Sequence, residues 1–198
     1  METPPASTPP RLVALAASAG GVHALGVVLS DLPADLPAPV IVVQHLAPHH
    51  RSHMAQILTR RTTLHVKQAR DGEVLRAGVV YIAPPDRHLL VNLDGTITLA
   101  ETEMVHFLRP SADLMFESAA AAFGPGVVAV VLSGTGEDGA MGVQAVKKRG
   151  GTVFVQNDQS AEFSGMPQAA IRTGIADRVL ELALIGRALE DVLRGEAA

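Results

Sequence analysis

Residues 12–21 read LVALAASAGG, an apolar run that stops at Ser18 and is followed by a pair of glycines. An uninterrupted apolar run of this length is typical of a strand buried on both faces of a parallel sheet. Glycines allow the chain to turn tightly, and residues 22–29 then predict a helix. Ser18 therefore stands at the carboxyl end of a buried strand, which is where open α/β sheets bind their ligands.

Three further apolar runs end in the same way and alternate with helical segments. Each is followed by polar residues or glycine, and Ser52 and Ser111 are suited to cap two of the helices. This alternation predicts a doubly wound α/β domain, with a mostly parallel β-sheet flanked by helices. The expected strands are residues 40–43, 127–132 and 152–155, and the expected helices are 52–60, 111–122, 140–148 and 182–193.

The middle of the chain has a different pattern. Short strand-like runs at residues 79–83, 88–92 and 96–100 surround turn-forming residues, among them the pair Asp94-Gly95. Because Asp-Gly is a strong hairpin signal, a small antiparallel hairpin or insert is expected near residues 78–100. We expect residues 1–10, METPPASTPP, to be a disordered Pro-rich leader and residues 11–198 to be a single domain.

Composition excludes several classes of function. The 198 residues contain no cysteine, which rules out disulfides, thiolate zinc sites, iron–sulfur clusters and a cysteine nucleophile. A net charge of −4 without a basic stripe, and only 3% aromatic residues, argue against nucleic-acid binding. No apolar run approaches the ~20 residues that span a bilayer, and there is no secretory signal, so a cytoplasmic location without membrane insertion is expected.

Three strand ends carry side chains with catalytic chemistry, namely Ser18, His45 and Asp138. A serine hydroxyl becomes a nucleophile when a histidine takes its proton, and a carboxylate orients that histidine. Each residue also has a simpler interpretation. Ser18 and Asp138 are alternatively helix N-caps, and His45 is alternatively a loop histidine.

Two other motifs predict different sites. Gly134, Gly136 and Gly139 match G-x-G-x-x-G after a strand and before a helix, with Asp158 about 20 residues on, as in dinucleotide-binding folds. Carboxylates at 137 and 138 disfavour a pyrophosphate there. His49 and His53 have the spacing of a helical zinc pair, but no glutamate lies among the neighbouring histidines to act as a base.

Several of these motifs, in this order, resemble the catalytic domain of the chemotaxis protein-glutamate methylesterases, the CheB type. The resemblance covers nearly the whole chain from residue 11 to residue 189. It is carried by residues 15–21 (LAASAGG), 43–45 (VQH), 71–73 (DGE), 81–88 (YIAPPDRH), 109–113 (RPSAD), 132–140 (LSGTGEDGA) and 165–167 (GMP).

The resemblance implies a serine hydrolase whose nucleophile is Ser18, base His45 and orienting acid Asp138, with no cofactor and no metal. It implies hydrolysis of glutamate γ-methyl esters on the cytoplasmic helices of a chemoreceptor to glutamate and methanol, and in many members deamidation of receptor glutamines. Backbone amides near Ala19 and Thr135 are the expected oxyanion donors. Chemotaxis members usually carry an N-terminal receiver domain, whereas only about ten residues precede the first expected strand here. This chain is therefore expected to be either a stand-alone esterase, for which a receiver would act in trans, or an excised piece.

Two alternatives to the esterase remain open at this stage. One is a non-catalytic signalling or interaction module that keeps the fold, because folds outlive functions. The other is a dinucleotide-binding domain that uses Gly134–Gly139.

Overall fold

The structure of the chain, a computed structural model, describes residues 11–45 and 53–195. These residues form a seven-stranded sheet in which every pair of neighbouring strands is parallel, in the order β3-β4-β2-β1-β7-β8-β9. The strands are β1 (Leu12–Ala17), β2 (Val40–Gln44), β3 (His65–Gln68), β4 (Val79–Ile82), β7 (Val127–Val131), β8 (Thr152–Gln156) and β9 (Arg178–Leu180).

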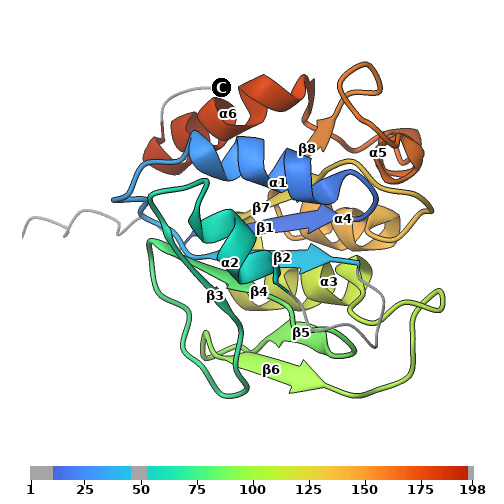
Figure 1. Ribbon diagram of the computed structural model, residues 1–198. Helices are drawn as coiled ribbons and strands as arrows, with labels where there is room; N and C mark the ends of the chain where they lie inside the picture. Colours follow the sequence, from blue (N-terminus) through green and yellow to red (C-terminus); the bar gives the residue numbers. More distant parts are fainter. Residues whose placement is uncertain (1–10, 46–52, 196–198) are drawn as a thin grey trace, which may run out of the picture.

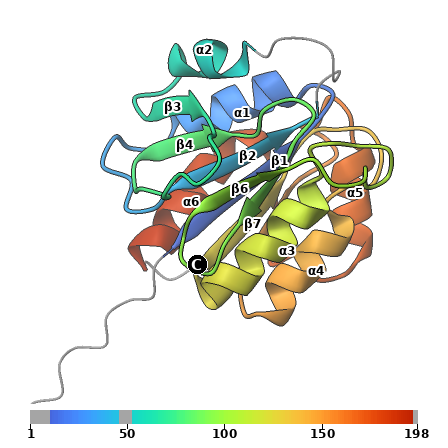
Figure 2. The same cartoon turned by 90° about the horizontal axis from the view of Figure 1, so that it is seen from below.

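Helices cover both faces of the sheet, as expected for a doubly wound domain (Figure 1). One face carries α1 (Gly21–Ser30), α2 (Met54–Thr59) and α6 (Leu182–Arg194). The other carries α3 (Ala112–Phe123), α4 (Ala140–Lys148) and α5 (Gly165–Arg172), and a single turn of 3-10 helix, Gly124–Gly126, leads from α3 into β7. Figure 2 shows α3 and α4 side by side over this second face.

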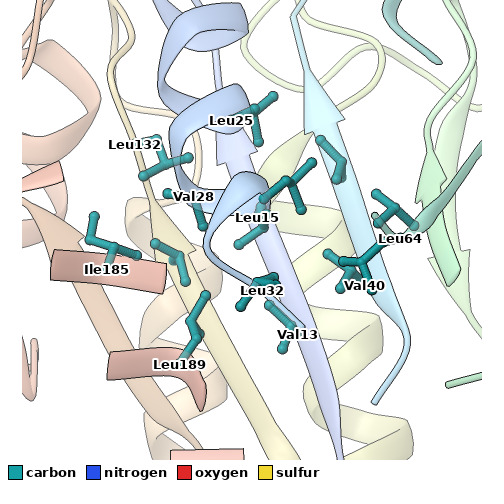
Figure 3. Close-up of a cluster of buried hydrophobic side chains, with 14 of the residues drawn as sticks. Val13, Leu15, Leu25, Val28, Leu32, Val40, Leu64, Leu132, Ile185 and Leu189 are labelled. Carbon is teal, nitrogen blue, oxygen red and sulfur yellow. The ribbon is translucent and has the colours of Figure 1, made fainter. Parts of the chain in front are cut away.

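β1, the central strand, is apolar throughout because both of its faces are buried. Val13, Leu15 and Ala17 pack into the core beneath α1 and α6, whereas the alternate residues pack into the core beneath α3 and α4. Successive side chains of a strand point to opposite faces, so a strand covered on both sides must be apolar throughout. Figure 3 shows Val13 and Leu15 among leucines and valines of the first of these cores.

Two features differ from the sequence-based expectation. The antiparallel hairpin is present, but it consists only of β5 (His88–Val91) and β6 (Ile97–Ala100), and β4 belongs to the parallel sheet between β2 and β3. The short elements β3, α5 and β9 were not expected at all. The proposed N-cap Ser52 and the leader 1–10 lie outside the described residues.

No helix within residues 11–45 and 53–195 has both the length and the hydropathy needed to cross a membrane.

Candidate active site

Three adjacent strands deliver the three candidate residues to one edge of the sheet. β1 lies between β2 and β7, and Ala17 pairs with Gln44 on one side while Ala16 pairs with Val131 on the other. Ser18, His45 and the segment before Asp138 therefore all leave the sheet at its carboxyl edge. Neighbouring strands are about 4.8 Å apart, so side chains at adjacent strand ends lie within reach of one another.

Ser18 is placed by the turn that joins β1 to α1. Its amide donates to the carbonyl of Ser133 (3.0 Å), and Gly20 then takes a left-handed conformation with a φ of 73°. The N-cap of α1 is Gly20, and no side chain caps this helix. The interpretation of Ser18 as a helix N-cap is therefore wrong, and its hydroxyl makes no hydrogen bond to any other described residue, His45 included.

Gln44 joins the backbones of Ser18 and His45. Its Nε2 donates to the carbonyl of Ser18 (2.7 Å) and to that of His45 (3.0 Å), and the side chain is buried. Gly21 leaves room for it, since a Cβ there would lie 2.1 Å from Gln44 Oε1 and 2.7 Å from the Cβ of Ala17. The sequence reasoning did not single out Gln44, although a polar residue ending a buried strand directly before His45 was the available signal.

His45 and Asp138 form the central contact of the site. His45 Nε2 lies 2.8 Å from Asp138 Oδ2, across 93 positions of sequence. The side chain of His45 is 7% exposed and that of Asp138 is fully buried. The expected proximity of these two residues is therefore found in the structure.

Asp138 is held by the first turn of α3. Its Oδ1 accepts from Ser111 Oγ (2.9 Å) and from the amide of Asp113 (3.1 Å), and its Oδ2 accepts from the amide of Ala112 (2.6 Å). Burial favours the neutral acid, but hydrogen bonds from His45 and from these amides outweigh it and lower the pKa of Asp138. An ionised carboxylate only accepts hydrogen bonds, so His45 Nε2 carries a proton, and in the neutral ring the lone pair is on Nδ1.

Asp113, in the first turn of α3, binds the start of α4 in the same way that Asp138 binds the start of α3. Its Oδ1 accepts from the amides of Gly139 (2.9 Å) and Gly142 (2.7 Å), which open α4. Burial raises the pKa of Asp113 to about 6, and the neighbouring Asp138 adds to this effect. The interpretation of Asp138 as the cap of its own helix is therefore wrong, because that role belongs to Asp113. Sequence reasoning gave this residue no role, although it ends the motif at residues 109–113 and lies two positions after the N-cap Ser111.

A buried histidine, His88, accepts a hydrogen bond from the backbone of Ser111. His88 is fully buried, its Nδ1 accepts from the amide of Ser111 (3.1 Å), and its Nε2 donates to the carbonyl of Glu103 (3.1 Å). Burial lowers the pKa of His88, which favours the neutral ring that this pattern of one acceptor and one donor needs. His88 thereby fixes the residue that binds Asp138, a role that its place in the motif at residues 81–88 did not reveal.

The glycine-rich turn after β7 lies against Ser18. A Cβ at Gly134 would be 2.9 Å from the Cβ of Ser18, so the backbone of this turn comes close to the nucleophile candidate. The amides of Ala19, which follows Ser18, and of Thr135, which follows Gly134, donate no hydrogen bond to any described residue. Both amides are therefore available to an oxyanion, and their role as its donors stays a prediction.

The same turn is poorly suited to a dinucleotide. In dinucleotide-binding folds the pyrophosphate accepts the amides at the start of the helix. Here the amides of Gly139 and Gly142 are already taken by the Asp113 carboxylate. Of the proposed zinc pair, His49 lies outside the described residues, and the ring of His53 contacts Gln56 Oε1 (3.0 Å).

The comparisons with known proteins decide the family. A model of the family "CheB methylesterase" matches residues 13–189. The chain belongs to the CheB methylesterase family. Its fold is that of the crystal structure of the Thermotoga maritima CheB methylesterase catalytic domain, which aligns with a TM-score of 0.89 at 34% identity, over 93% of this chain and 100% of that one.

Curated relatives share this family relationship over part of their length. One is "Protein-glutamate methylesterase/protein-glutamine glutaminase 3" of Anaeromyxobacter dehalogenans, 46% identical over 183 residues, which covers 89% of this chain and 54% of that protein. Another is "Protein-glutamate methylesterase/protein-glutamine glutaminase 4" of Myxococcus xanthus, 43% identical over 188 residues, which covers 95% of this chain and 53% of that protein. The chain thus spans about half the length of these relatives.

Proposed function

We propose that this chain is the catalytic part of a protein-glutamate methylesterase, with Ser18 as nucleophile, His45 as general base and Asp138 as the acid that orients it. The observation that carries the proposal is the buried His45–Asp138 contact of 2.8 Å at the same sheet edge as Ser18, in a member of this family. Chemoreceptors are the substrates of the family, a methylated chemoreceptor is the proposed partner, and a receiver domain is the proposed regulator.

The reaction follows from the protonation state of the site. His45 Nδ1 takes the proton of the Ser18 hydroxyl as Oγ attacks the ester carbonyl, and Asp138 stabilises the imidazolium that results. The amides of Ala19 and Thr135 stabilise the oxyanion. The imidazolium then protonates the methoxide, methanol leaves, and water hydrolyses the acyl-serine to free the glutamate side chain.

The same steps deamidate glutamine if ammonia leaves in place of methanol. The two relatives named above are both called glutaminases as well as methylesterases. Because both reactions pass through one acyl-serine, we propose that the second activity uses the same three residues.

Methanol release from membranes that hold a methylated receptor tests the proposal. Ser18→Ala and His45→Ala should each reduce the rate by about 10³-fold or more, with the far-UV circular dichroism and melting temperature retained. Ammonia release from unmodified receptor glutamines should fall in parallel. Unchanged methanol release by Ser18→Ala would contradict the assignment of the nucleophile.

A further inference from the structure

Two large apolar side chains lie in solvent beside His45. Phe107 is 94% exposed and Met104 is 57% exposed, on the segment that joins β6 to α3. Together with His45, Leu108 and Pro110, and with the charged residues Asp86 and Arg109, they line a cavity of about 110 Å³. Burying a phenylalanine from water is worth roughly 1.5–3 kcal/mol. A partner that covers this segment would therefore gain binding free energy from burying Phe107.

The backbone holds Phe107 outward at a cost. Val105 and Leu108 exchange two backbone hydrogen bonds (3.2 and 2.8 Å), and both residues between them have positive φ, 51° at His106 and 62° at Phe107. The left-handed conformation costs a residue other than glycine roughly 1–2 kcal/mol. Strain of this kind is found preferentially where it presents a functional side chain.

Arg109 fixes the base of this turn. Its Nη1 donates to the carbonyls of Glu101 (3.2 Å) and Thr102 (2.7 Å), and its Nε and Nη2 donate to Asp86 Oδ1 (2.9 and 2.7 Å). One guanidinium thus ties the β6–α3 segment to the turn that follows β4. The backbone that carries Phe107 is therefore tied down while its side chain stays uncovered, which reduces the backbone entropy lost when a partner binds.

We propose that Met104 and Phe107 are the docking surface for the helix that carries the reacting glutamate side chain. This rests on the proposed function, and it names how the substrate protein is held. A glutamate γ-ester is short, so a helix whose ester reaches Ser18 must lie directly over His45 and the adjoining cavity. Side chains three and four positions away share one face of a helix. An apolar side chain one turn from the ester therefore enters the cavity and contacts Phe107.

The test compares a protein substrate with a small one. Methanol release is measured at varied concentrations of methylated receptor, and in parallel with N-acetyl-glutamate α-amide γ-methyl ester, for wild type, Phe107→Ala and Phe107→Leu. Leu93→Ala is the matched control, because Leu93 is also 82% exposed but lies on the β5–β6 turn and, with Arg11, lines a different cavity. Ser18→Ala reports separately on the proposed function.

Phe107→Ala should lower kcat/KM toward the receptor about tenfold or more, mainly through KM, and leave hydrolysis of the small ester within a factor of two. Phe107→Leu should restore part of the loss, and Leu93→Ala should change neither rate. Replacing the apolar receptor residue one turn from the ester with serine should reduce the effect of Phe107→Ala, as expected for residues in contact.

Three results would overturn the docking surface. The first is an unchanged receptor rate in Phe107→Ala. The second is an equal loss toward both substrates, which would mean that Phe107 shapes the site itself. The third is a smaller sedimentation coefficient of Phe107→Ala than of wild type, measured without receptor, together with an unchanged receptor rate. That result would assign the surface to contact with a second copy of the chain. Methanol release that persists in Ser18→Ala would instead contradict the proposed function.

Discussion

Asp138 accepts hydrogen bonds from the start of α3, and Asp113 accepts hydrogen bonds from the start of α4. Asp138, which precedes α4, accepts from Ser111 and the first amides of α3, and Asp113, in the first turn of α3, accepts from Gly139 and Gly142 at the start of α4. The partial positive charges of two helix N-termini are thus satisfied by exchanged carboxylates. The position of Asp138 consequently depends on how α3 and α4 pack.

Removing the charge of Asp138 should disable His45. Asp138→Asn cannot hold the Nε2–H tautomer in place, because an amide has a donor as well as an acceptor to present to the ring. We expect kcat for methanol release to fall by about 10³–10⁴-fold with little change in KM. Asp94→Asn, on the exposed β5–β6 turn, is the surface control. Retention of a tenth of the wild-type rate by Asp138→Asn would contradict this role.

The raised pKa of Asp113 makes a signed prediction about stability. A carboxyl that titrates near 6 when folded and near 3.8 when unfolded binds its proton more tightly in the folded state, so its contribution to stability falls as the pH rises from 4 to 6. Asp113→Asn keeps an acceptor oxygen for Gly139 and Gly142 without a charge. Relative to this variant, the wild-type free energy of unfolding should fall by as much as about 3 kcal/mol between pH 4 and pH 7.

Urea unfolding of both proteins across that range measures the difference. The lowered pKa of Asp138 stabilises the fold at higher pH, and this contribution is lost mainly as the pH falls below 4. The pH ranges in which Asp113 and Asp138 affect stability are therefore different. A difference between wild type and Asp113→Asn that does not vary from pH 4 to pH 7 would refute the prediction.

The amide of Gln44 should matter to both stability and rate. Gln44→Met keeps the length of the side chain but leaves the carbonyls of Ser18 and His45 without their donor. We expect a loss of about 2–4 kcal/mol in the free energy of unfolding and at least a tenfold lower kcat. Gln144→Met, on the exposed side of α4, should change neither. Wild-type kcat in folded Gln44→Met would show that Gln44 does not position the pair.

Alanine substitutions at two packed glycines, Gly134 and Gly151, distinguish an effect on the site from an effect on stability alone. A Cβ at Gly134 would meet Ser18 Cβ at 2.9 Å and Met166 Sδ at 2.2 Å, whereas one at Gly151 would meet Val146 Cγ1 at 2.6 Å, near the start of β8 and away from the site. Both alanine variants should lose about 1–3 kcal/mol by overpacking. Only Gly134→Ala should also lower the rate of methanol release per folded molecule. Equal rates in the two variants would show that the approach of Gly134 to Ser18 is unimportant.

The sequence predicted the parts of the molecule that have strong periodic signals. The buried strands β1, β2, β7 and β8 are continuous apolar runs, and their ends located Ser18, His45 and Asp138 at one edge. Edge strands such as β3 and β9 are short and partly exposed, so they leave no such run.

The contacts of the supporting residues could not be predicted from the sequence for a different reason. Asp113 and Gln44 act through contacts between elements that are distant in the chain, 26 positions apart for Gln44 and Ser18. Local patterns suggest a helix N-cap for a residue such as Asp138, and only the packing of α3 on α4 shows that the carboxylates are exchanged. The catalytic roles of Ser18, His45 and Asp138 stay predictions for the variants above to test.

The placement of His45 and Asp138 on opposite sides of β1 also bears on folding. Their hydrogen bond closes a loop of 93 positions and requires both halves of the sheet to have joined the central strand. Contacts of such long range form only after the loop entropy has been overcome. Esterase activity would therefore report completion of the native topology, and an intermediate with native helix content but unpaired strands would be inactive.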